Sequence, residues 1–164
     1  MHLALMGELP SMRRQDKEIK NPIHLRQILE AAIVCRVAMC DGDRPYVVPL
    51  SFVVDGDALY VHSAAHGRKL DVLRRNANVC FEVDEGVEPV PHEEACSVGM
   101  RFLSVIGTGR ATFLGAAAEK VRVLQRFAAK YAPNAGGSMP DHEVEKTVVI
   151  RLSIETLTGK RSGK

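Results

Sequence analysis

Short runs in which apolar and polar residues alternate dominate this chain, and they predict β-strands. In residues 35–40 the alternation places Cys35, Val37 and Met39 on one face, since successive side chains of a strand point to opposite faces. The same pattern predicts strands over residues 45–54, 58–62, 78–84, 100–114 and 146–157. Asp41-Gly42 and Asp55-Gly56 are typical of tight turns, so we expect the first three strands to follow one another as antiparallel hairpins.

Two features indicate where the predicted sheet is open or bent. Pro49 has no N–H to donate to a neighbouring strand, so the strand over residues 45–54 is expected to lie at an edge or to carry a bulge. Gly107 and Gly109 interrupt the long strand over residues 100–114, and glycines there mark a bulge, a bend or a close approach. About six strands of this kind, with only short helices, favour a mainly β (α+β) fold in which an antiparallel barrel is closed or partly closed, rather than a sandwich.

Helical periodicity is limited to three segments. Asn21-Pro22 is typical of an N-cap followed by proline at the first helical position and predicts a helix that ends near residue 33. A short helix is predicted from residue 68 and a longer one over residues 116–131. The acidic segment 85–98 contains glycine and proline, so we expect an irregular loop that forms a rim or faces a partner, and residues 159–164 are expected to be a basic tail. Residues 1–12 are expected to be an N-terminal arm that precedes one domain over residues 13–164.

The composition is that of an ordinary globular domain. The chain has 164 residues, 46% of them hydrophobic and 26% charged, with a net charge of +2, so it can bury a core of its own and its charge gives no argument for a nucleic-acid partner. We find no segment of membrane-spanning length and no signal-peptide pattern, and we therefore expect a cytoplasmic protein without a membrane partner. The four cysteines form no CxxC pair, so they are expected to be reduced and structural, and no metal site is predicted.

The strongest candidate chemistry lies in residues 60–75, YVHSAAHGRKLDVLRR. Arg68 and Lys69 fall in the first turn of the predicted short helix, where unpaired N–H groups and the helix dipole already make the environment positive. A bound phosphate would offset these charges, and Gly67 would let it approach the backbone. The alternative is a solvated helix end whose long cationic side chains reach into water.

Five segments in order, RRQDKEI, PYVVPLSFV, LYVHSAAHGRKLDVLRRNANVCFEVD, LSVIGTGRA and TGKRS, carry a resemblance that covers nearly the whole chain. Together they resemble the nitroimidazole-resistance (Nim) branch of the pyridoxamine 5′-phosphate oxidase-like, FMN-binding split-barrel family. The resemblance implies a six-stranded split barrel that forms a homodimer and binds FMN, with FAD as the alternative, between its subunits. Tyr46 stands where pyridoxamine phosphate oxidases proper carry a further phosphate-binding arginine, and their C-terminal substrate motif is absent, so vitamin B6 oxidation is not expected.

The resemblance also implies roles for individual residues. Arg68 and Lys69 match the pair that binds the flavin phosphate, and Ser104 with Val105 matches a dipeptide that faces the cofactor from the partner subunit. His66 is a further candidate phosphate donor. The positions expected beside the flavin ring or in the adjoining turn are Val47, Val48, Pro49, Leu50, His62, Ser63 and Ala64.

His62 is the candidate catalytic residue. Its ordinary pKa lies near neutrality, so beside a flavin it could donate a proton while the cofactor delivers hydride. The alternative is a histidine that packs beside Tyr60 and is hydrogen-bonded within the barrel. We expect an FMN-dependent oxidoreductase that reduces nitroaromatic or similar small electrophiles. NAD(P)H would be a transient donor, because the chain carries no dinucleotide fingerprint.

Two other functions remain open on the same residues. One is a flavin carrier or sensor without turnover. The other is a haem protein in which His62, His66 or His92 is the axial ligand.

Overall fold

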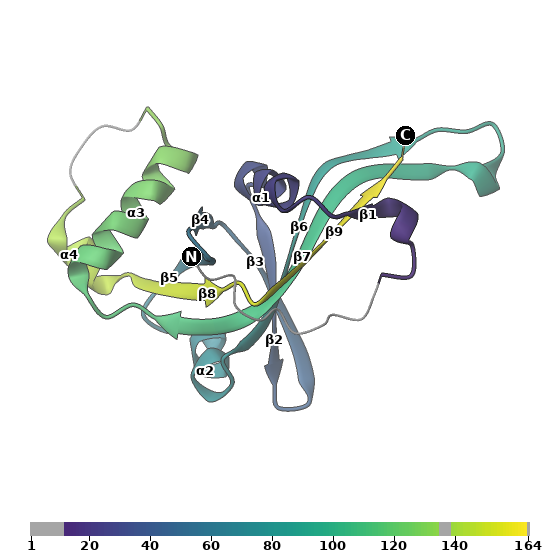
Figure 1. The fold of residues 1–164 in the computed structure, drawn as a ribbon. Helices are drawn as coiled ribbons and strands as arrows, with labels where there is room; N and C mark the ends of the chain where they lie inside the picture. Colours follow the sequence, from purple (N-terminus) through teal and green to yellow (C-terminus); the bar gives the residue numbers. More distant parts are fainter. Residues whose placement is uncertain (1–11, 135–138, 164) are drawn as a thin grey trace.

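An antiparallel sheet of nine strands organises the protein, seen here in a computed structural model that describes residues 12–134 and 139–163 (Figure 1). The strands are β1 (Glu18–Ile19), β2 (Cys35–Asp41), β3 (Arg44–Leu50), β4 (Val53–Asp55), β5 (Ala58–Ser63), β6 (Asn78–Val90), β7 (Gly99–Phe113), β8 (Val148–Ser153) and β9 (Thr156–Ser162). The main order is β3-β2-β6-β7-β8-β5-β4, and β9 pairs with β7 and with β1. The two ends of this path, β3 and β4, do not pair with each other, so the barrel is split. The predicted antiparallel split barrel is confirmed.

Two predicted strands are each divided in the structure. The chain leaves β3 after Leu50 and starts β4 at Val53; β3 pairs with β2, whereas β4 pairs with β5. Residues 146–157 likewise divide into β8 and the start of β9, so the prediction of a basic tail from residue 159 is wrong. Apolar alternation continues across both breaks because both halves of the barrel bury side chains in one core, and the pattern therefore conceals them.

The three predicted helices are confirmed as α1 (Pro22–Ala31), α2 (Arg68–Arg75) and α3 (Ala117–Tyr131). Asn21 caps α1 as expected, since its Oδ1 accepts a hydrogen bond of 2.9 Å from the N–H of Ile23. The short α4 (Asp141–Lys146) and the 3-10 turns η1 (Gln15–Lys17) and η2 (Ala95–Ser97) were not predicted. Among the described residues no helix is long and apolar enough to cross a bilayer. Residues 1–11 of the expected N-terminal arm lie outside the described range.

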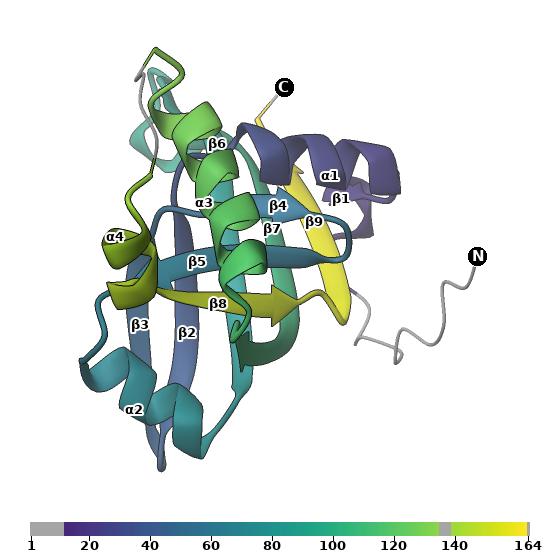
Figure 2. The same ribbon diagram turned by 90° about the vertical axis from the view of Figure 1, so that its left-hand side faces the viewer.

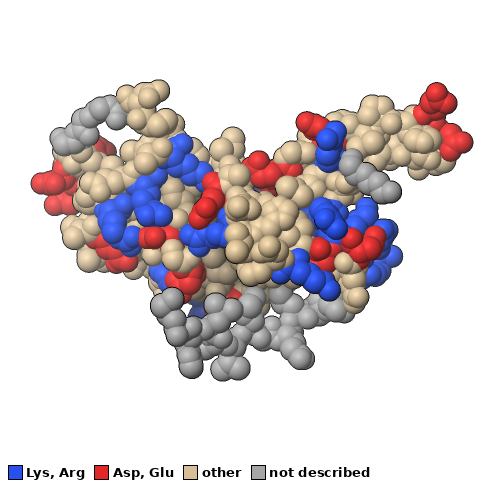
Figure 3. Space-filling view, turned by 45° about the horizontal axis from the view of Figure 1, so that its top comes forward, with Lys and Arg blue, Asp and Glu red and all other residues tan. Residues whose placement is uncertain are grey.

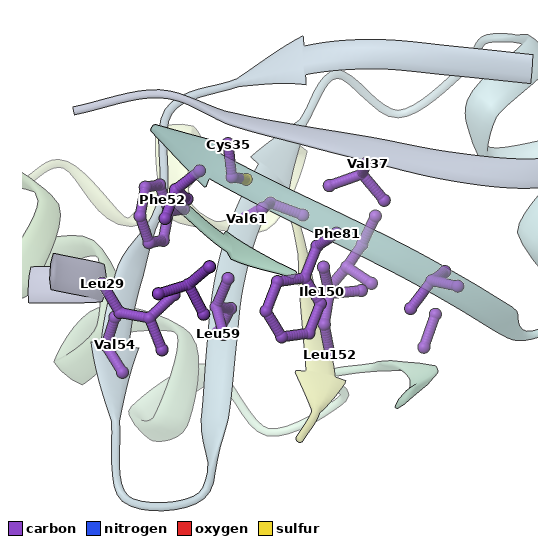
Figure 4. Close-up of a cluster of buried hydrophobic side chains, with 14 of the residues drawn as sticks. Leu29, Cys35, Val37, Phe52, Val54, Leu59, Val61, Phe81, Ile150 and Leu152 are labelled. Atoms are coloured by element: carbon purple, nitrogen blue, oxygen red, sulfur yellow. The ribbon is translucent and has the colours of Figure 1, made fainter. Parts of the chain in front are cut away.

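The core has two parts. The larger cluster fills the barrel and includes Leu29, Phe52 and Phe81 (Figure 4). The smaller cluster joins α3, through Val123 and Phe127, to the outer face of β4, β5 and β8 (Figure 2). The protein therefore places α3 across one outer wall of the barrel.

The glycines of β7 allow close packing, as the sequence indicated. A Cβ atom on Gly107 would overlap the ring of Phe81, and one on Gly109 would overlap the carbonyl oxygen of Ser153. Only glycine leaves room for these neighbours, so β7 can pair with β6, β8 and β9 along its length.

The irregular loop predicted for residues 85–98 is wrong for residues 85–90, which are strand, and holds for residues 91–98 apart from the 3-10 turn η2. β6 continues to Val90, and it pairs with β7 as far as Val90↔Gly99 after a register shift between Glu85 and Glu88. Gly86 (φ 60°) lies in this shift, where a glycine accommodates a bulge without ending the strand. The two strands extend from the barrel as a ribbon that ends in η2 (Figure 1).

Candidate functional site

The start of α2 lies beside β3 and just after the end of β5 (Figure 2). Gly67 precedes the helix with φ 142°, a conformation that favours glycine, and its carbonyl accepts from the N–H groups of Leu70 and Asp71. Arg68 and Lys69 occupy the first two helical positions, as predicted. The structure therefore brings the predicted phosphate-binding pair to the predicted edge strand.

Arg68 is already held by protein groups. Its Nε donates to Asp41 at 3.1 Å, and its guanidinium group stands 4.5 Å from the ring centroid of Tyr46. Arg75 donates to the same carboxylate, and the two arginines lower the pKa of Asp41. The positive charge of Arg68 is thus partly offset, and its side chain is 57% exposed.

Lys69 has a different environment. Its side chain is half-buried, and this burial lowers its pKa. The ionisable group that would act on it is the thiol of Cys35, but burial raises the pKa of that thiol to about 12, so the thiol is neutral at physiological pH and supplies no negative charge. Among the described residues no carboxylate forms an ion pair with Lys69. A partly buried cation without a counter-ion is unfavourable, and an anion at this position would stabilise it.

His62 lies at the end of β5 on the outer face of the barrel wall, below α3. Its ring meets the ring of Phe127 edge to face, with centroids 4.7 Å apart and an interplanar angle of 82°. Packing against protein atoms lowers the pKa of His62, and the nearby charge of Lys69 lowers it further. The imidazole nevertheless retains an exposed side. Of the alternative for His62, the shared face with Tyr60 is confirmed, since both side chains lie toward α3, but the place within the barrel is wrong, because Leu59 and Val61 fill the inner face of β5.

The predicted ring-binding segment forms the edge strand that Pro49 indicated. β3 ends the strand order and, within residues 12–134 and 139–163, pairs only with β2, so there one side of its backbone is open for further hydrogen bonds. Val47 and Pro49 are exposed, while Val48 and Leu50 pack against the core.

The residues of the turn between β5 and α2 lie between His62 and the Arg68–Lys69 pair in the sequence. Ser63 pairs with Val148 at the end of β5, and Ala64 and His66 are exposed in the turn before α2.

Ser104 and Val105 lie apart from these residues within one chain. They belong to β7, which β2 and β6 separate from β3 in the sheet. The Val105 side chain is completely buried in the core, whereas Ser104 is half-buried on the opposite face, level with Asp84 and Lys160. The Val105 side chain therefore cannot contact a cofactor, and a contribution of this strand across a subunit interface stays a prediction.

Three residues of the site were not predicted from sequence. Asp41 was identified only as a turn residue, Cys35 only as a strand residue with a structural role, and Phe127 only as part of the helix predicted over residues 116–131. Each acts through a contact between elements distant in the sequence, and strand or helix periodicity does not report such contacts.

Comparison with known proteins identifies the fold family. The sequence profile of pyridoxamine 5′-phosphate oxidase matches residues 24–161. A protein of Bacteroides thetaiotaomicron proposed to act in 5-nitroimidazole antibiotic resistance is 31% identical, with a TM-score of 0.77 over 88% of this chain and 86% of that one. The flavocytochrome Anf3 of Azotobacter vinelandii is 25% identical, with a TM-score of 0.82 over 94% of this chain and 73% of that one. An FAD-binding protein of Mesorhizobium loti is 26% identical, with a TM-score of 0.63 over 87% and 96%.

A curated sequence from Rhizobium meliloti, an uncharacterized protein, matches a shorter segment. It is 34% identical over 58 residues, which span 35% of this chain and 38% of that protein.

A barrel that stays open between β3 and β4, with a short helix that starts beside the edge strand, defines a split-barrel protein. The profile match covers most of the chain, so the chain belongs to the pyridoxamine 5′-phosphate oxidase family. The resemblance to the nitroimidazole-resistance branch of this family is confirmed by the match to the Bacteroides protein.

Proposed function

We propose that the protein binds a flavin, FMN with FAD as the alternative, whose phosphate lies at Lys69 and the start of α2. The observation that carries this proposal is the partly buried Lys69, which has no carboxylate partner among the described residues. A flavin phosphate would provide the missing charge, and the first backbone N–H groups of α2 would donate to it. Arg68 would add a second, more exposed cation.

The open edge of β3 suits the ring of the same cofactor. Backbone groups of Val47 to Leu50 on the unpaired side of the strand can bind the polar edge of a heterocycle, and the exposed Val47 and Pro49 offer apolar contact. In the homodimer that we propose, a second subunit would cover the ring, and Ser104 of β7 is the candidate contact from that subunit.

We further propose that the flavin serves the reduction of nitroaromatic or similar small electrophiles. When bound, a flavin supplies hydride transfer. Reduction of a nitro group to a nitroso group takes up two electrons and two protons and releases water, and NAD(P)H would supply the hydride. His62 is the proposed proton donor. Because its pKa is lowered, the protonated imidazole becomes populated at a lower pH than that of an ordinary histidine.

The relatives agree with this proposal. The Mesorhizobium protein binds FAD, and the Bacteroides protein is the one proposed to act in nitroimidazole resistance. The similarity to a flavocytochrome keeps haem binding as the second candidate.

An absorption spectrum of the purified protein separates the cofactors. Flavin bands, with FMN or FAD released on denaturation, are expected; a haem spectrum without flavin would contradict the proposal. Turnover is tested separately, by mixing the flavin-loaded protein with NADH or NADPH and a nitroimidazole. Loss of the nitro absorbance is expected, and its persistence would leave a flavin carrier or sensor.

A further inference from the structure

Asp41 binds two arginines that come from opposite ends of one helix. It is the last residue of β2, at the start of the turn that leads into β3. The Nε of Arg68, at the first position of α2, donates to one carboxylate oxygen at 3.1 Å, and Arg75, at the last position, donates to the other. The carboxylate is less exposed than either arginine. Asp41 is therefore the counter-ion of both ends of α2.

A second aspartate makes a similar arrangement on another helix. Asp55 faces Arg122 and Arg126 of α3, and Figure 3 shows cationic and acidic side chains close together over that helix. These two arginines lie one helical turn apart on one side of α3, so Asp55 joins the side of a helix to the barrel wall. Asp41 differs, because one of its arginines stands at a helix start, where unpaired backbone N–H groups favour an anion.

The guanidinium group of Arg68 therefore faces two anions. The proposed function places a flavin phosphate at Lys69 and the first N–H groups of α2, directly next to Arg68 in the chain. Asp41 already accepts from the Nε of Arg68, and the ring of Tyr46, 4.5 Å from the guanidinium group, stabilises the arginine in that place. A carboxylate and a phosphate also repel each other. The two anions thus compete for Arg68.

We propose that Asp41 is an internal competitor of the flavin phosphate, which holds Arg68 until a flavin binds and makes the bound flavin easier to release. This inference rests on the proposed function, because the flavin phosphate is the competing anion. On binding, Arg68 changes its partner from Asp41 to the phosphate, whereas Arg75 stays on the carboxylate. Arg68 exchanges one anionic partner for another, so it adds little to the affinity, and Lys69 contributes most of it. The protein then holds an exchangeable flavin.

Replacement of Asp41 by asparagine gives the first test, in the full chain freed of flavin. Asparagine keeps the shape of the side chain and removes its charge, and exposed ion pairs contribute little to folding, so Asp41→Asn stays folded. We expect its dissociation constant for FMN to fall about fivefold at low ionic strength, mainly through slower release of FMN. Its dissociation constant for riboflavin, which lacks the phosphate, should stay within about twofold of wild type. An unchanged affinity for FMN would overturn the proposal, and a weaker one would do so by showing that Asp41 positions Arg68 for the phosphate.

Matched variants separate this effect from a general change in charge or in helix anchoring. Asp43→Asn removes an exposed carboxylate from the same turn, and Asp55→Asn removes a carboxylate that likewise binds two arginines of one helix. Both should leave the affinity for FMN within about twofold of wild type. In the Arg68→Met background, Asp41→Asn should bring no gain, because the arginine that it would release is gone. A gain of the same size in that background, or in Asp43→Asn, would contradict the proposal.

The change of partner at Arg68 can also be observed directly. In ¹⁵N-labelled wild-type protein the Nε–H resonance of Arg68, identified by its loss in Arg68→Met, should shift when FMN is added and stay in place when riboflavin is added. A resonance that FMN leaves in place would show that Arg68 remains on Asp41, against the proposal. If the wild type binds neither FMN nor riboflavin, the proposed function fails together with this inference. Binding of FMN by the wild type without a gain in Asp41→Asn overturns this inference alone.

Discussion

Replacement of Lys69 by methionine tests the proposed phosphate site most directly. Methionine keeps a long apolar side chain at this half-buried position and removes the charge. Because Lys69 is half-buried and has no carboxylate partner among the described residues, the ammonium group is free to bind an anion at full strength. We therefore expect Lys69→Met to weaken FMN binding strongly while the protein stays folded.

The expected loss follows from the kind of bond that is removed. A hydrogen bond to a charged group contributes roughly 1.5–3 kcal/mol, which corresponds to a rise in the dissociation constant of about 10- to 150-fold. Arg68→Met should cost less, about fivefold at most, because Arg68 is 57% exposed and paired with Asp41. Lys20→Met, at a lysine that is 75% exposed, serves as the control for loss of one positive charge.

Riboflavin separates the phosphate site from the ring site. It has the same ring as FMN but no phosphate, so fluorescence titration of the apoprotein with both ligands gives a double-mutant cycle in which the phosphate is one of the two changes. Lys69→Met should weaken FMN binding and leave riboflavin binding unchanged. An equal loss for both ligands would show that Lys69 does not bind the phosphate, and so would an unchanged affinity for FMN.

Three further predictions concern stability and pH. The folded state lowers the pKa of His62 below 6.5, so the unfolded chain binds more protons and the free energy of unfolding falls as the pH drops below that value. His62→Gln should flatten this pH dependence of the free energy of unfolding, measured by urea unfolding. The same variant should abolish the rise in the rate of nitro reduction on acidification. Tyr131→Phe should lower the free energy of unfolding by about 1–3 kcal/mol, since the hydroxyl accepts from Phe52 N–H at 2.8 Å, and an unchanged urea midpoint would contradict this. Gly109→Ala should lower the free energy of unfolding by more than about 3 kcal/mol, because the added Cβ would overlap Ser153. Gly115→Ala is the control: a Cβ there has nothing within 4 Å, so its thermal unfolding should match that of the wild type.

Most of the barrel is predictable because its signals are local. The Asp-Gly turns, the Asn21 cap and the alternation of β2 each depend on neighbouring residues, and the structure keeps all of them. Strand breaks are not local in this sense. At the β3–β4 and β8–β9 breaks the backbone changes its pairing partner while the side chains remain in the same core, so hydrophobicity does not change where hydrogen bonding does.

The candidate site follows the same division. The helix start at Arg68 and the edge strand at Pro49 were found from sequence, because dipole, turn and proline chemistry are local. What distinguishes Arg68 from Lys69 is not local. Asp41, from another hairpin, engages the arginine, whereas no carboxylate of the described residues pairs with the lysine.

The split in the barrel explains why the open edge of β3 and the Lys69 cation lie on the same side of the molecule. Where β3 gives way to β4, the sheet ends and backbone groups need other partners. On one side of the break Tyr131 supplies them, because its hydroxyl binds both the N–H and the carbonyl of Phe52. On the other side the open edge of β3 runs back from Leu50, which pairs with Cys35 of β2, and the half-buried Lys69 stands in the first turn of α2, a helix that packs against β2. A ligand with a hydrogen-bonding flat ring and an anionic tail would satisfy both the open edge and the unpaired cation, and a flavin mononucleotide has both parts.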